Sequence, residues 1–109
     1  MVKTFELKEN EKIEFELSGD YWEKSILFLE KQRSGKFILT DKRIIFVYGT
    51  PYADIDYSDI EKIEKCNIGP SIVKFVPTGI KIITKDGKIH KLSVLKRSKY
   101  MEFIESKIR

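Results

Sequence analysis

The chain has 109 residues, of which 41% are apolar and 35% charged, and 21 Lys and Arg against 17 Asp and Glu give a net charge of +4. This length fits one domain, spanning residues 1–109, whose core needs no disulfide or metal, because such a chain hides roughly two thirds of its unfolded surface on folding. The composition excludes a multidomain enzyme, a disulfide scaffold, a collagenous chain and a membrane-spanning protein.

Two short strands are predicted in the N-terminal third. Apolar and polar residues alternate over Ile13–Leu17, the period of a half-buried strand. Ser18-Gly19-Asp20 is expected to end that strand, because these residue types favour turns. The apolar centre of Ser25–Lys31 predicts the second strand.

The next segment predicts a hairpin. The β-rich runs Lys36–Thr40 and Arg43–Tyr48 are separated only by Asp41-Lys42, so they are expected to pair. Gly49-Thr50-Pro51 is expected to close this unit, since proline cannot donate a hydrogen bond to a sheet.

The segment Ile55–Cys66 has two interpretations. Ser58-Asp59-Ile60-Glu61 fits a helix capping box and predicts a short helix. Ile55 and Tyr57 instead alternate, which predicts a strand that runs into a turn. Asn67–Ser71 follows and is expected to be a loop.

A second hairpin is predicted over residues 79–94, around Asp86-Gly87. A two-residue loop would mix apolar and charged side chains on both faces. A three-residue loop with a left-handed Gly87 pairs Thr84 with Lys88, and we therefore choose this bulged turn. It places Ile80, Ile82, His90, Leu92 and Val94 on one face, and Lys81, Ile83, Ile89 and Lys91 on the other.

The C-terminus predicts an amphipathic helix of about three turns. Its apolar stripe consists of Tyr100, Met101, Ile104 and Ile108, with Phe103 on the flank. Ser98 is the expected N-cap, and Lys107 suits the negative end of the helix dipole. In a small β domain, such a stripe is expected to pack on the core.

Three segments in order resemble a known family. Residues 35–46 (GKFILTDKRIIF), 55–63 (IDYSDIEKI) and 79–88 (GIKIITKDGK), followed by the helix, are similar to GRAM and bacterial pleckstrin-homology-like (PH-like) domains. The resemblance covers about residues 9–108. It implies a mainly β fold: a PH-like barrel of seven antiparallel strands in two bent sheets, capped by one C-terminal α-helix. It also favours a strand over Ile55–Ile63 and leaves Ile13–Leu17 and Ile26–Lys31 as candidates for the first strand.

The resemblance also bears on the ligand. PH domains that bind phosphoinositides use a basic loop between their first two strands, with a Lys-x-Arg step followed by apolar residues. Here Lys31-Gln32-Arg33 provides the step, but Ser34-Gly35 follows, which counts against phosphoinositide recognition.

No catalytic or cofactor-binding pattern is present. His90 is the only histidine and is expected to be structural, and Cys66 is the only cysteine, so no intrachain disulfide can form. Asp54, Asp56 and Asp59 lack the spacing of a cation-binding loop and are expected to be solvated. We therefore predict a protein that is not an enzyme and has no metal, no cofactor and no catalytic residue.

The charge is unevenly distributed. Residues 1–64 carry ten basic and fourteen acidic side chains, a net of −4, whereas residues 65–109 carry eleven and three, a net of +8. Such asymmetry suggests an anionic partner for the second half or head-to-tail self-association, and the alternative is that the charges mix in the folded surface. The candidate anion- or lipid-binding residues lie in the second hairpin and at the helix start: Lys81, Lys85, Lys88, Lys91, Lys96, Arg97 and Lys99.

These observations lead to two functional hypotheses. The first is a PH-like binding module that acts through protein or peptide contacts, including contacts with copies of itself. The alternative is a peripheral membrane module that binds anionic lipid headgroups through the basic hairpin and helix start. Nucleic acid is not an expected partner, since the basic half has few free aromatic residues. The N-terminus has no signal-peptide pattern, so we expect a cytoplasmic protein, with the inner membrane surface as its location under the alternative.

Overall fold

The computed structural model describes residues 6–24, 30–66 and 79–108. Within these ranges the chain forms seven strands, a single turn of 3-10 helix and one α-helix. They are β1 (Ile13–Lys24), β2 (Glu30–Thr40), β3 (Arg43–Tyr48), β4 (Thr50–Asp56), η1 (Tyr57–Asp59), β5 (Ile60–Cys66), β6 (Gly79–Thr84), β7 (Ile89–Val94) and α1 (Arg97–Ile108). No described helix is long and apolar enough to cross a bilayer.

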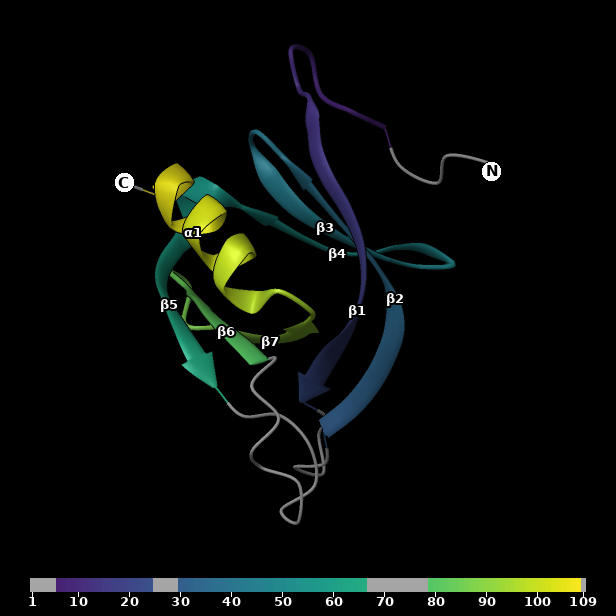
Figure 1. Cartoon of the computed structure of the whole chain (residues 1–109), viewed down its shortest axis with the longest axis vertical. Coiled ribbons are helices and arrows are strands. Elements are labelled where there is room, and N and C mark those ends of the chain that lie inside the picture. Colours follow the sequence, from purple (N-terminus) through teal and green to yellow (C-terminus); the bar gives the residue numbers. More distant parts are fainter. Residues whose placement is uncertain (1–5, 25–29, 67–78, 109) are drawn as a thin grey trace.

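The strands form one antiparallel sheet in the order β4-β3-β2-β1-β7-β6-β5. β1 pairs with β2 and, through Gly19–Trp22, with β7, so it joins the two expected half-sheets into one. The sheet curls into a half-barrel, and α1 lies across its concave side, where it contacts η1, β5 and β6 (Figure 1). β4 and β5 are the two edges of this open barrel. The expected mainly β fold with seven strands and a C-terminal helix is confirmed.

The core fills the concave side of the sheet. Phe46 lies at its centre, with its ring centroid 4.7 Å from that of Phe37 and 5.2 Å from that of Tyr21. Met101 and Ile104 of α1 are buried in the same cluster. The helix therefore covers the core as expected, because its apolar stripe is the surface that the open half-barrel leaves uncovered.

The hairpin of β6 and β7 has the predicted register. Ile82 pairs with His90 and Ile80 with Leu92, and the Thr84 N–H donates to the Lys88 carbonyl at 3.0 Å. Gly87 has a φ of 88°, the left-handed conformation that the bulged turn requires. The predicted apolar face is the buried one, with His90 half-buried at its end.

The predicted end of the first strand is wrong. β1 continues through Ser18-Gly19-Asp20 to Lys24. At Gly19 a Cβ atom would lie 2.6 Å from the Ser93 carbonyl oxygen and 2.8 Å from the Phe37 ring. Glycine is required here because β1 crosses close to β7 and the core, and not because the chain turns.

The predicted second strand lies partly outside the described residues. Its centre, residues 25–29, is not described, whereas Glu30 and Lys31 belong to β2, which pairs with β3 as expected. The predicted loop at Asn67–Ser71 also lies outside the described residues.

Gly49-Thr50-Pro51 does not end the unit. The chain reverses at Gly49, and β4 begins at Thr50 and pairs with β3. Pro51 is tolerated within β4 because this strand forms an edge of the sheet, where no other described strand pairs with one side of its backbone.

The ambiguous segment is a strand, a turn and a second strand. β4 ends at Asp56, the three residues of η1 follow, and β5 begins at Ile60. The capping-box interpretation is therefore wrong, because edge-strand pairing of Ile60–Cys66 with β6 takes up the residues that would extend a helix.

The helix begins one residue before the predicted cap. Ser98 is its second residue, and Lys96 precedes it with a φ of 57°. The Lys96 carbonyl accepts hydrogen bonds from the N–H groups of Lys99 and Tyr100, at 3.0 and 3.4 Å. The prediction of Ser98 as N-cap is wrong because the tight turn after β7 starts the helix earlier.

Candidate functional site

The sheet order places the acidic and the basic part of the sequence on different strands. β1 to β4 derive from the acidic part of the sequence and lie together at one side, while β6 and β7 derive from the basic part and lie at the other. β5 spans the boundary between residues 64 and 65, where the acidic part of the sequence ends and the basic part begins. The seven candidate basic residues therefore all lie on β6, β7, their turn, and the start of α1.

The structure divides these seven residues into three groups. Lys81 on β6 and Lys91 on β7 are directly opposite each other. Lys85 and Lys88 lie at the β6–β7 turn and are exposed. The remaining three lie after β7, at the start of α1, so the opposite ends of β7 separate them from the turn. The turn and the helix start do not combine into one basic site.

At the helix start, two of the three cations have partners. The Arg97 guanidinium is half-buried and donates through Nη1 to the carbonyls of Cys66 and Gly79, each at 3.4 Å. Lys99 lies over the rings of Phe15 and Tyr100, at 5.1 and 5.6 Å from their centroids. Arg97 therefore links the start of α1 to the ends of β5 and β6, while Lys96 remains exposed.

A hollow of about 480 Å³ lies beside the β6–β7 turn. Lys85, Lys88 and His90 line it together with the acidic residues Asp54, Asp59 and Asp86. Lys88 Nζ lies 3.9 Å from Asp86, and Asp54 pairs with Arg43. The hollow therefore contains charges of both signs, and its two lysines do not form a purely basic site.

His90 is half-buried and lies beside Tyr21. Its Nδ1 lies 2.9 Å from the Tyr21 hydroxyl, and burial lowers the pKa of the imidazole. Lys81 and Lys91 are paired directly across β6 and β7, on the face opposite the buried Ile80 and Ile82, and Lys81 also pairs with Glu64 of β5.

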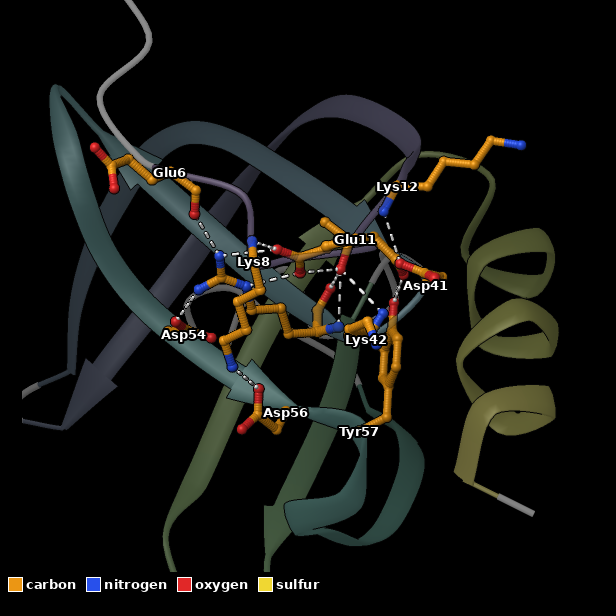
Figure 2. A network of polar contacts seen from close by, with 11 residues as sticks. Glu6, Lys8, Glu11, Lys12, Asp41, Lys42, Asp54, Asp56 and Tyr57 are labelled. Atoms are coloured by element: carbon orange, nitrogen blue, oxygen red, sulfur yellow. Dashed lines mark hydrogen bonds and ion pairs between the residues drawn. The ribbon is translucent and has the colours of Figure 1, made fainter.

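The strongest polar cluster in the described residues is one that sequence patterns missed. Arg43 donates through Nε and Nη2 to the two carboxylate oxygens of Glu11, at 2.8 and 3.0 Å, and through Nη1 to Asp54 at 2.5 Å (Figure 2). Its Nη2 also donates to the Glu6 carbonyl at 2.8 Å. Thr40 donates to Glu11 at 2.7 Å.

This cluster has a structural role. The carboxylate of Glu11 would have a raised pKa from burial alone, but hydrogen bonds from Arg43, Thr40 and the Lys8 backbone outweigh burial and lower the pKa to about 2. The Tyr57 hydroxyl donates to the Thr40 carbonyl at 2.7 Å, and burial raises its pKa. The cluster fixes the segment before β1 to the β2–β3 turn, which gives Thr40 and Arg43 of the segment 35–46 a structural role.

Two of the carboxylates considered as cation ligands have other partners in the described structure. Asp54 pairs with Arg43, and Asp56 accepts a hydrogen bond from Lys8 at 3.4 Å, so these carboxylates have partners other than a cation. Across residues 6–24, 30–66 and 79–108, no three His, Cys, Asp or Glu residues come together as ligands.

The edge strand β5 is the second feature that sequence patterns missed. It pairs with β6 on one side, and among the described residues no strand lies on its other side. Figure 1 shows it at the margin of the sheet, with α1 on the concave side. An unpaired edge exposes backbone N–H and C=O groups that can pair with another chain. The other edge, β4, carries Pro51, which weakens such pairing.

Solved structures with the same fold were found by comparison. A C-terminal domain of an unknown protein from Leishmania infantum matches with a TM-score of 0.69 and 19% identity over 92% of this chain and 86% of that one. A Slm1-PH domain, whose analysis is described as demonstrating ligand binding in the non-canonical site, matches with a TM-score of 0.62 and 9% identity over 89% and 96%. This chain has a PH-like fold.

A second Slm1-PH structure, in complex with phosphoserine, matches with a TM-score of 0.57 and 11% identity over 85% of this chain and 90% of that one. No family model matches the sequence, and no curated protein matches it. At these identities the similarity establishes the PH-like fold alone, and the bacterial and GRAM-like assignments stay predictions.

Proposed function

We propose that this chain is a non-enzymatic PH-like binding module that acts through protein contacts made by the edge strand β5. The observation that carries the proposal is the open edge over Ile60–Cys66, which faces no strand of the described chain. An extended segment of a partner can add to such an edge through backbone hydrogen bonds, while side chains on both faces select the sequence.

The charge of the edge supports this proposal. Glu61, Lys62 and Lys65 are exposed, and Ile63 is partly buried against the core. Edge strands often carry charges that oppose indiscriminate pairing, so a partner strand must present matching charges. Selective protein binding therefore fits this edge better than aggregation.

Selection from a displayed library of random peptides tests the proposal. We expect enriched peptides to shift the amide NMR resonances of Ile60–Cys66, and binding to weaken in a Lys62→Glu/Lys65→Glu variant. Lys85→Glu/Lys88→Glu is the matched control, because it changes the same charge at the β6–β7 turn. Peptides that bind equally to the β5 variant, or no enrichment at all, would contradict the proposal.

Binding to anionic headgroups is the second candidate, and the Lys81–Lys91 pair favours it. These two side chains lie opposite each other on the outer face, and Lys91 also pairs with Trp22 of β1. Two lysines at directly opposite positions can both donate to one phosphate group. Flotation with phosphatidylserine vesicles, against phosphatidylcholine, tests this function, and a Lys81→Glu/Lys91→Glu variant should lose it.

The helix start provides a comparison for the same experiment. If a Lys96→Glu/Arg97→Glu/Lys99→Glu variant loses flotation while the hairpin variant keeps it, headgroups bind at the helix instead. If neither variant changes flotation, both headgroup sites are wrong.

A further inference from the structure

The exposed edge of β5 has a symmetric charge pattern. Residues 61–65 read Glu-Lys-Ile-Glu-Lys, so reversing the strand about its centre places each acid opposite a base. We infer that β5 pairs antiparallel with β5 of a second copy about a twofold axis at Ile63. This inference rests on the proposed function, since it names the partner of the same edge.

The register follows directly from the pattern. Ile63 faces its own copy on the axis, Lys62 faces Glu64, and Glu61 faces Lys65. Because the axis is twofold, each of these charged pairs occurs twice, which gives four pairs of opposite charge across the two strands. Opposite charges directly across an antiparallel ladder stabilise it.

Other registers place like charges together. A shift by one residue brings Glu61 opposite Glu64, or Lys62 opposite Lys65, depending on its direction. A shift by two brings Lys62 or Glu64 opposite its own copy. A parallel arrangement in register aligns every charge with itself. The pattern therefore selects one antiparallel register and disfavours its neighbours.

The structure keeps this edge suitable for pairing. Lys62 through Cys66 pair regularly with β6, and the bulge of the strand lies before them, between Ile60 and Lys62. The central charges, Lys62 and Glu64, form an exposed ion pair within one copy at 3.0 Å. Pairing of two copies would join two such ion pairs into a network of four alternating charges.

The contact between the two β5 strands is small, so we expect a low affinity. A strand of seven residues buries much less than the roughly 1,000 Å² of a stable interface, so the dimer should be weak and exchange rapidly. We expect a dissociation constant on the order of 0.1 mM. Added salt should raise this constant, because the paired charges are exposed to solvent.

Sedimentation velocity over about 0.01–1 mM protein tests the inference, since this range brackets the expected dissociation constant. Lys65→Glu places Glu61 opposite a second glutamate at both symmetric positions and should raise the dissociation constant about tenfold or more. Glu61→Lys/Lys65→Glu restores opposite charges in the same register and should restore the dimer. Lys85→Glu, the same charge change away from β5, should leave the dimer unchanged.

The negative results of these experiments distinguish the self-pairing from the proposed function. A wild-type chain that stays monomeric at about 1 mM, or a double exchange that does not restore association, refutes the self-pairing. A monomeric chain that still binds selected peptides along β5 leaves the proposed function standing. A dimer that persists in Lys65→Glu also refutes the inference, because association must then use another surface.

A cysteine exchange checks the register independently of affinity. In a Cys66→Ser background, we expect a mixture of Lys62→Cys and Glu64→Cys chains to form a disulfide between the two different chains, because these positions face each other across the axis. Either variant alone should cross-link less. Equal cross-linking in the mixture and in the separate samples would overturn the proposed register.

Discussion

Replacement of Glu11 by glutamine should destabilise the fold by about 3 kcal/mol at neutral pH. The Glu11 side chain is 0% exposed and accepts two hydrogen bonds from Arg43, whose side chain is 9% exposed. Removal of one partner of a buried ion pair costs about 3–5 kcal/mol, because the other charge remains buried. Asp54 still contacts Arg43 but is half exposed, so we expect the lower end of this range.

The pKa of Glu11 gives a similar magnitude. The value falls from an ordinary 4.5 to about 2, because hydrogen bonds from Arg43, Thr40 and the Lys8 backbone outweigh the burial that would raise it. This difference corresponds to about 3 kcal/mol of linked stability. Because the pKa is depressed in the folded state, the contribution is present above pH 4.5 and is lost as the pH falls toward 2.

Urea unfolding between about pH 7 and pH 2.5 measures both effects. The difference in unfolding free energy between the wild type and Glu11→Gln should be about 3 kcal/mol at pH 7 and should shrink in acid. Glu14→Gln, an exposed change on β1, is the matched control and should alter stability by less than about 0.5 kcal/mol. A difference below about 1 kcal/mol at pH 7, or one that does not depend on pH, would refute the ion-pair reasoning.

Three further predictions concern the core and the barrel. Gly19→Ala should cost about 1–3 kcal/mol in urea unfolding, because its Cβ would lie 2.6 Å from a β7 carbonyl oxygen, whereas Ser18→Ala should be nearly neutral. Ile104→Ala should cost about 2–5 kcal/mol in the same assay, since the residue is 1% exposed in the core. Burial lowers the pKa of His90 below its ordinary 6.5, so the free energy of unfolding should rise as the pH increases toward 6.5 and level off above it. His90→Gln should abolish that rise, and a pKa above 6.5 by NMR would contradict this prediction.

The β6–β7 hairpin could be predicted because its determinants are local. Alternation over residues 79–94 and a glycine at the turn fix both the register and the buried face. A prediction from local residue types was wrong at Gly19. This glycine was interpreted as part of a turn, but it allows β1 to pack closely against β7. A glycine in a short window carries no information about which distant backbone approaches it.

The candidate site could be predicted only in part, because it depends on contacts between residues that are far apart in the sequence. Glu11 and Arg43 are 32 residues apart, so the motif around Arg43 was visible in the sequence but its partner was not. The charge pattern of residues 61–65 was also visible, yet it acquires meaning only once β5 is known to be an edge. The basic residues of the hairpin and the helix start could be named from the sequence, but their spatial grouping could not, because β7 separates the β6–β7 turn from the helix start.

The two proposed activities can depend on each other. Lys81 lies opposite Glu64 of β5 and opposite Lys91, so pairing through β5 would place two Lys81–Lys91 pairs on one face of a continuous sheet. Two weak headgroup sites on one rigid surface bind a membrane more tightly than either alone. Glu61→Lys separates the effect of dimerisation from the effect of net charge. The substitution makes the chain more positive, but it places a lysine opposite Lys65 of the second copy and so disfavours the dimer. We expect this variant to float less well with phosphatidylserine vesicles than the wild type, and flotation that improves with the added charge would show that the monomer binds alone.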